Sequence, residues 1–262
     1  TGAAVSVMLI RAGVSPIATL PIAFLAGALA GMVTGLLNTA LGIPGILASI
    51  LTQISLYSIN LNIMGKANQP VSVDNYPLVV SLRYVTDGSV SRLLFFLGMI
   101  VFLLALIAVM YWYFGTEQGH AIRATGCNSN MARAQGINTN FIKVLALMIS
   151  NGLVGLCGAL YGQFQGASDV NMGRGAIVIG LAAVIIGEVL FGKFASKRKL
   201  AFAFTLASVI LGAVIYYMVY QFVLWLKMPS EDMKLFSAIV VAIFLAIPYL
   251  KEKRTLRKGA SK

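Results

Sequence analysis

The feature that most constrains the fold is a series of apolar runs long enough to cross a lipid bilayer. A membrane-spanning helix needs about 20 mainly apolar residues, and several runs reach that length. The strands of a membrane β-barrel alternate in polarity over segments of about ten residues, and these runs do not alternate. Charged residues make up 11% of the chain, roughly half the share in a soluble domain. We therefore predict an all-α, polytopic transmembrane helical bundle.

About eight membrane segments are predicted. Their approximate ranges are 2–12, 15–40, 43–64, 93–114, 141–165, 175–191, 199–226 and 233–250. The first is about half a span, so we expect one transmembrane domain, 1–262, that is truncated at its N-terminus. The Gly-Ile-Pro-Gly run at 42–45 predicts a turn between the second and third segments.

Two glycine ladders predict close packing between helices. Gly27, Gly31 and Gly35 are spaced by four, and so are the residues of a second set, Gly158, Gly162 and Gly166. Four residues make about one helical turn, so each set forms a smooth stripe against which a neighbouring backbone can pack.

The positions of basic residues predict the orientation in the membrane. The net charge is +12, which in a soluble protein would favour nucleic-acid binding. Membrane proteins concentrate Lys and Arg in cytoplasmic loops, so we expect lipid around the chain and no nucleic-acid partner. The basic residues gather in the connection 115–143, the loop 193–199 and the tail 251–262. These segments, with the C-terminus, are assigned to the cytoplasm.

One stretch resembles a nucleotide site without fulfilling its requirements. Gly187, Gly192 and Lys193 fit the phosphate-binding pattern G-x-x-x-x-G-K-[ST], but Phe194 stands in place of the Ser or Thr that holds Mg²⁺. The stretch also follows a predicted spanning helix instead of a strand. The two cysteines and the single His120 form no metal-ligating pattern. We therefore expect neither a cofactor nor a metal site in this chain.

The strongest functional signal is a polar segment between two predicted spans. It reads Arg123-Ala-Thr-Gly-Cys-Asn-Ser-Asn-Met-Ala-Arg-Ala-Gln-Gly-Ile137. Asn128 is suited to cap a short helix, and Gly136 to the left-handed conformation that ends one. Met131 and Ala134 would form its apolar side. Such a helix on the membrane face suits docking into a groove of a soluble partner. On the residues alone, a solvated loop helix without a partner is the equal alternative.

This segment resembles the cytoplasmic loop of bacterial ABC importer permeases of the branched-chain amino acid and ribose permease type. It matches their pattern R-A-x-G-x-N-x-x-M-A-x-x-x-G-I. Three further runs are similar to this group: NTALGIPG at 38–45, YSINLNIMG at 57–65 and VIIGEVLFG at 184–192. They resemble a subgroup with suggested aromatic amino acid substrates.

The resemblance implies a transport subunit without catalytic activity, located in the bacterial cell membrane. Two permease copies, here expected as a homodimer, would form the pathway for a small solute. Two cytoplasmic ABC ATPase subunits would bind ATP and Mg²⁺, and an extracellular solute-binding protein would deliver the solute. An amino acid is the predicted solute, with a nucleoside or sugar as the alternative. Coupling to the ATPase through the loop 115–140 is assigned to Arg123, Gly126, Asn128, Met131, Ala132, Arg133 and Gly136.

Polar side chains inside the predicted spans are candidates for lining the pathway. They are Asn38, Gln53, Asn60, Asn151, Gln163 and Gln165. The alternative for each is a hydrogen bond between helices.

Glu188 is the only acidic residue inside an apolar window. We expect it to have a structural or gating role near the inner interface, paired with Lys193, Arg133 or a neighbouring helix. An ion-gradient-driven secondary transporter or channel is the alternative function. That alternative predicts several intramembrane acidic or basic residues on the pathway, and only Glu188 qualifies.

Overall fold

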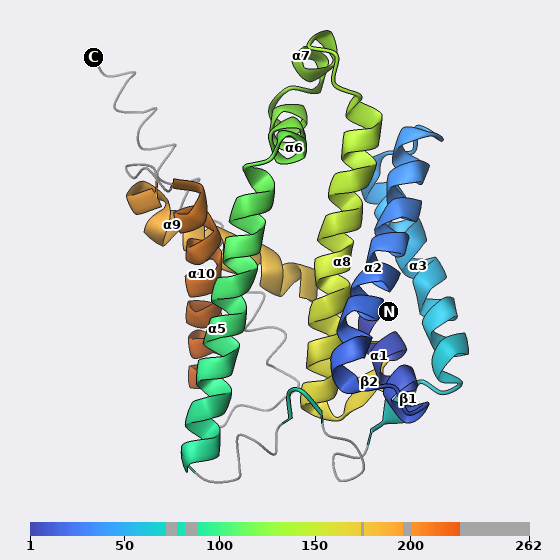
Figure 1. Cartoon of the computed structure of the whole chain (residues 1–262), viewed down its shortest axis with the longest axis vertical. Helices are drawn as coiled ribbons and strands as arrows, with labels where there is room; N and C mark the ends of the chain where they lie inside the picture. The colour runs from blue at the N-terminus through green and yellow to red at the C-terminus, as the bar shows by residue number, and fades with distance from the viewer. Residues whose placement is uncertain (72–77, 82–88, 174–175, 196–200, 226–262) are drawn as a thin grey trace. The chain divides into compact units, whose positions relative to one another are not determined.

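The computed structural model describes residues 1–71, 78–81, 89–173, 176–195 and 201–225 of the chain (Figure 1). The chain divides into two compact units. Thr1–Ala105 and Trp112–Met172 form the first unit, and Leu106–Tyr111 and Gly173–Lys262 form the second.

Long helices build the first unit. They are α2 (Pro16–Thr39), α3 (Gly45–Met64), most of α5 (Ser89–Phe114) and α8 (Thr139–Gln165). Three shorter helices accompany them: α1 (Gly2–Arg11), α6 (Glu117–Cys127) and α7 (Ser129–Ala134). The strands β1 (Asn68–Pro70) and β2 (Ala167–Asp169) pair antiparallel. Because β1 follows α3 and β2 follows α8, the sheet joins the ends of these two helices (Figure 1).

Helices α2 and α8 pack antiparallel through the first glycine ladder. A methyl group at each of its glycines would overlap α8: at Gly27 the carbonyl of Asn151, at Gly31 the carbonyl of Leu147, and at Gly35 the backbone of Val144. The glycine numbers rise as their partners' numbers fall, which defines the antiparallel direction. The predicted close approach of a neighbouring backbone is thus confirmed for this ladder.

The second glycine ladder is only partly a packing stripe. Gly158 and Gly162 face α1, where added methyl groups would contact Ala3. Gly166 ends α8 with φ of 67°. It is therefore a left-handed C-cap, and the prediction that it continues the stripe was wrong because the helix stops one residue earlier.

The second unit contains α9 (Ala176–Ala195) and α10 (Ala201–Trp225). These two helices also pack closely at glycines, because a methyl group at Gly187 would overlap the Ser208 carbonyl and one at Gly212 the Ala183 carbonyl. Beside these contacts lies a small apolar core of Ala182, Ile186 and Tyr216, with Ile179 and Ile215 packed against it.

Five described helices are long and apolar enough to cross a membrane: Pro16–Thr39, Gly45–Met64, Arg92–Phe114, Thr139–Gln165 and Phe202–Gln221. They correspond to the predicted segments 15–40, 43–64, 93–114, 141–165 and 199–226. The segments 2–12 and 175–191 also form helices, but their described apolar stretches, Gly2–Arg11 and Ile179–Phe191, are shorter. The segment 233–250 and the tail 251–262 lie outside the described residues. The polytopic helical bundle is confirmed, and the count of eight is not. The turn at 42–45 is confirmed, since Gly42 has φ of 66° between α2 and α3.

Candidate functional site

The predicted coupling segment forms two short helices at one end of the first unit. Helices α6 and α7 lie across the connection between the end of α5 and the start of α8 (Figure 1). Thr116 caps α6, its hydroxyl accepting from the Gly119 N–H at 3.4 Å. A methyl group at Gly119 would overlap backbone atoms of Tyr113 and Phe114. The glycine therefore allows α6 to fold back tightly against the end of α5.

The start and end of α7 follow the predicted local chemistry. The Asn128 side-chain oxygen accepts from the N–H groups of Asn130 at 3.1 Å and Met131 at 3.0 Å. Gly136 has φ of 82°, and its N–H donates to the Arg133 carbonyl at 3.0 Å. The predicted cap and the predicted left-handed glycine are both confirmed.

The faces of α7 determine what it can contact. Ala132 is 2% exposed and is the residue that anchors the helix against its surroundings, which are α6 and α8. Met131 is 62% exposed, and Ala134 is also exposed. The apolar side expected from Met131 and Ala134 is therefore exposed and faces away from the described residues of the first unit. An exposed methionine is a flexible apolar group that adapts well to a partner surface.

Arg133 connects α7 to the start of α8. Its guanidinium Nη2 donates to the Thr139 hydroxyl at 3.3 Å, and Thr139 is buried. The Asn138 side chain accepts from the Phe141 N–H at 3.1 Å and caps α8. The candidate set missed Asn138 and Thr139, although an Asn or Thr directly before an apolar run is a known helix-start signal.

The remaining coupling candidates lie on α6 instead of in an irregular loop. Arg123 is exposed on this helix. A methyl group added at Gly126 would meet no atom of the described residues within 4 Å. Between them Thr125 is buried, and its hydroxyl has no hydrogen-bond partner in the described part of the chain. Gly126 thus leaves open space on the outer side of α6, where a partner backbone could approach closely.

Four of the six pathway candidates have hydrogen-bond partners inside the chain, and three of these bond within five residues of their own position. The Asn38 amide donates to the Ile43 carbonyl at 2.8 Å and closes the turn between α2 and α3. The Asn151 amide donates to the Leu147 carbonyl of its own helix at 2.9 Å. The Gln165 amide donates to the Tyr161 hydroxyl at 2.8 Å.

Gln163 is the centre of a buried hydrogen-bond network and is itself 1% exposed. Its Nε2 lies 3.3 Å from the Ser6 hydroxyl, 3.2 Å from the Thr19 hydroxyl and 3.2 Å from the Pro16 carbonyl. Its Oε1 accepts from the Val79 N–H at 3.1 Å. The side chain thereby links α8 to α1, to α2 and to the segment 78–81.

Gln53 and Asn60, the two candidates on α3, differ from the others. Gln53 is exposed, and within the described part of the chain its amide makes no hydrogen bond. Asn60 is 9% exposed, and its Oδ1 has no partner among the described residues.

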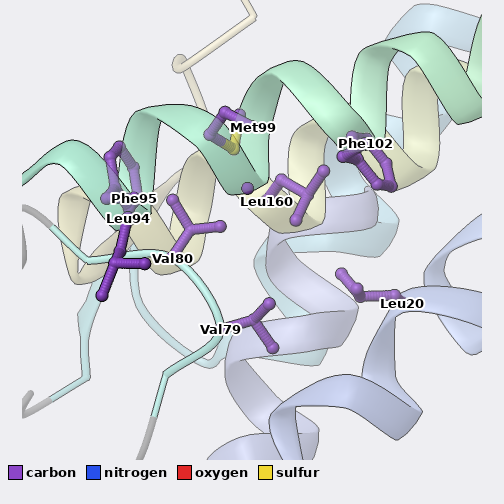
Figure 2. Close-up of a pocket in the computed structure, with 9 residues that line it drawn as sticks. Leu20, Val79, Val80, Leu94, Phe95, Met99, Phe102 and Leu160 are labelled. Atoms are coloured by element: carbon purple, nitrogen blue, oxygen red, sulfur yellow. The ribbon is translucent and has the colours of Figure 1, made fainter.

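An apolar hollow of about 390 Å³ lies in the first unit, toward the end of α8 that is opposite to α7 (Figure 2). Figure 2 shows side chains of α2, α5, α8 and the segment 78–81 pointing toward it. Its lining residues are Leu20, Val79, Val80, Leu94, Phe95, Gly98, Met99, Phe102 and Leu160. Val79 is also the residue whose N–H group Gln163 binds, so the buried network positions one wall of the hollow.

Glu188 lies on an exposed side of α9. Its expected pairing stays a prediction, because the Lys193 side chain is outside the described residues and Arg133 belongs to the other unit. The α9 helix runs without a break from Gly187 through Lys193. Backbone N–H groups inside a helix are bonded along it, so this stretch has no free N–H groups to cradle a phosphate. In the described ranges no group of three or more His, Cys, Asp or Glu residues could hold a metal ion.

Comparison with known proteins gives consistent matches. The family model described as "Branched-chain amino acid transport system / permease component" matches residues 1–248. The chain is 39% identical over 245 residues to the "Tyrosine transport system permease protein" of Clostridioides difficile (strain R20291), covering 94% of this chain and 77% of that one. It is 30% identical over 228 residues to an uncharacterized protein of Rickettsia prowazekii (strain Madrid E), covering 86% and 76%.

A further relative is the "Autoinducer 2 import system permease protein LsrC" of Yersinia pseudotuberculosis (serotype O:3, strain YPIII). It is 28% identical over 226 residues, which is 85% of this chain and 59% of the relative. No solved structure matches the chain.

Proposed function

Because the chain belongs to the family of permease components of branched-chain amino acid transport systems, we propose that it forms the translocation pathway of an ATP-binding cassette importer in a bacterial cell membrane. The family consists of transport permeases, and the chain is a multi-pass membrane protein without an enzymatic role. We propose a single permease domain over 1–262 and a cytoplasmic C-terminal tail, in keeping with the basic residues at 251–262.

The outward face of α7 is the observation that carries this proposal. The helix is short, capped at both ends and anchored by the buried Ala132, while Met131 is 62% exposed. A rigid helix that presents an apolar side chain suits a groove on a soluble partner. We assign that partner as the ABC ATPase, which holds ATP and Mg²⁺. Arg123, Gly126, Asn128, Met131, Ala132, Arg133 and Gly136 form or support the docking surface.

Movement of the ATPase would pass from α7 into the spanning helices. Arg133 and Asn138 connect α7 to the first turn of α8. Close backbone packing at Gly27, Gly31 and Gly35 then connects α8 to α2. We propose that a second copy of the chain completes the pathway and that an extracellular binding protein delivers the solute.

An amino acid is the solute we propose. The Clostridioides difficile relative is named for tyrosine transport and matches 94% of this chain, which supports an aromatic amino acid. The autoinducer 2 import relative has lower identity, 28%. A nucleoside or sugar is the alternative, and uptake of labelled tyrosine in competition with these solutes distinguishes them.

The docking role is tested by co-purification of the permease with its candidate ABC ATPase. Met131→Glu places a charge on the outward apolar position of α7 and is expected to abolish retention of the ATPase. Asn140→Glu is the matched control, because Asn140 is exposed in the first turn of α8, where an acidic residue is favourable. Normal retention with Met131→Glu would contradict the proposal, as would transport that continues without any ATPase.

A further inference from the structure

One face of α3 is polar from Ser49 to Asn60, although α3 is long and apolar enough to be a membrane span. Successive residues of a helix are rotated by about 100°, which places Ser49, Gln53, Tyr57 and Asn60 within an arc of about 80°. An adjacent arc holds the exposed apolar residues Leu47, Ile50, Ile54 and Leu61. The apolar arc is suited to lipid, and the polar arc is not.

Hydrogen bonding within the helix distinguishes Ser49 and Ser55 from Gln53. The Ser49 hydroxyl donates to the Gly45 carbonyl at 2.9 Å, and the Ser55 hydroxyl to the Leu51 carbonyl at 3.0 Å. A serine bonded back to its own helix is tolerated in hydrocarbon. The Gln53 amide is exposed and makes no hydrogen bond to any described residue. An amide left unpaired in an apolar medium costs several kcal/mol, so Gln53 requires water, solute or protein beside it.

Asn60 gives an independent indication on the same face. It lies two turns along the helix from Gln53, is 9% exposed, and has an Oδ1 without a partner in the described part of the chain. A nearly buried acceptor without a partner is a place for a water or solute donor. Tyr57, which is 45% exposed, lies between these two residues.

From this arrangement we propose that the polar face of α3, formed by Ser49, Gln53, Tyr57 and Asn60, lines the solute pathway. This inference rests on the proposed transport function. The face extends about 16 Å along the helix axis, roughly half of a hydrocarbon core of about 30 Å. Among the five spans, α3 also has the lowest mean hydropathy, 1.4 against 1.8 to 3.1. Both properties are those of a helix in contact with a water-filled conduit.

The chemistry of the face indicates the class of solute. Residues 45–64 contain no charged side chain, so the face would not select a solute with a net charge. It offers an amide at Gln53, a second amide at Asn60 and a phenol at Tyr57. These groups can hydrogen-bond to a zwitterionic or uncharged molecule, and the Tyr57 ring can contact an aromatic one. The inference therefore keeps Gln53 and Asn60 from the six pathway candidates. It adds Tyr57 as a further pathway residue.

Cysteine labelling tests the inference in the full-length protein. Only Cys127 and Cys157 need removal, for example as Cys127→Ser and Cys157→Ser. Gln53→Cys and Tyr57→Cys are then exposed to a charged, membrane-impermeant thiol reagent in intact cells and in inverted vesicles. Ile54→Cys is the matched control, because Ile54 is 63% exposed on the apolar arc. We expect labelling at positions 53 and 57 to be at least about tenfold faster than at 54, since thiolates form in water and not in lipid.

The possible outcomes separate the alternatives. Equal, slow labelling at positions 53, 54 and 57 would overturn the inference. A spontaneous disulfide between two copies of the Gln53→Cys variant would also overturn it, because the face would then be a dimer interface. Ser49→Cys is a second site on the same face if Gln53→Cys does not fold. Labelling requires neither a known solute nor an ATPase. The labelling result can therefore contradict the pathway inference while Met131→Glu still abolishes ATPase retention. Equally, labelling can support the inference while Met131→Glu leaves retention unchanged.

Discussion

Replacing Gln163 by methionine should destabilise the first unit by an amount that can be derived from its contacts. Methionine keeps the length of the side chain but removes both polar atoms. The Val79 N–H loses its acceptor, at a cost of about 1–3 kcal/mol if it stays buried. The other partners remain paired, because Ser6 and Thr19 bond each other at 2.8 Å and Thr19 donates to the Pro16 carbonyl at 2.7 Å.

The amino group of Gln163 adds the second part of the loss. It has two hydrogens and three acceptors within reach, so at most two full bonds disappear, at about 0.5–1.5 kcal/mol each. The sum is about 2–6 kcal/mol. We expect the lower half, about 2–4 kcal/mol, because the segment 78–81 can shift to bring the Val79 N–H to water.

Thermal unfolding of the purified protein in detergent measures this effect. For a chain of this size, about 1 kcal/mol changes Tm by roughly 2–4 °C, so Gln163→Met should lower the apparent Tm by about 4–16 °C. Gln165→Met is the matched control: it makes the same chemical change two residues away at an exposed amide, and it should change Tm by less than about 2 °C. If the two variants unfold at the same temperature, the reasoning about the network is refuted.

Two further predictions concern the glycine contacts and the α7 cap. Gly31→Ala should cost about 1–3 kcal/mol, since the methyl group meets the Leu147 carbonyl. Gly98→Ala, where a methyl group meets nothing within 4 Å of the described atoms, should be neutral or slightly stabilising in the same unfolding assay; equal losses would contradict the packing argument. Asn128→Ala should remove about 1 kcal/mol from the start of α7 and speed amide hydrogen exchange at Met131 by about fivefold. The exposed Asn130→Ala, which removes no cap, should leave that exchange unchanged; a faster rate there would contradict the assignment.

The sequence predicted features that depend on neighbouring residues. Asn128 and Gly136 act through backbone groups two or three positions away, so their roles were readable from the order of residues. The inward position of Ala132 was not, because it depends on where α7 rests against α6 and α8. A four-residue spacing also did not reveal that Gly166 lies one residue beyond the end of α8.

The hydrogen-bond partners of Gln163 show most clearly which contacts could not be predicted from the sequence. Ser6, Thr19 and Val79 are 157, 144 and 84 residues away in the chain. Each is an ordinary residue in its own segment, and only the tertiary arrangement brings them together. By contrast, Gln53 and Asn60 could be recognised as unusual from their position in an apolar run. The structure then separated them from Asn38, Asn151 and Gln165, whose amides are paired.

The glycine contacts between α2 and α8 restrict how these helices can move. A carbonyl group of α8 projects into the space above Gly27 on α2, and a second carbonyl group projects into the space above Gly31. If α8 slid along α2 by one residue, about 1.5 Å, each carbonyl would move toward a neighbouring side chain. If the two helices tilted together, each carbonyl would stay above its glycine. We therefore expect a displacement of the α7 end of α8 to tilt α2 and α8 together as one rigid pair. The helices would not slide along each other, so the displacement would reach the opposite end of the pair.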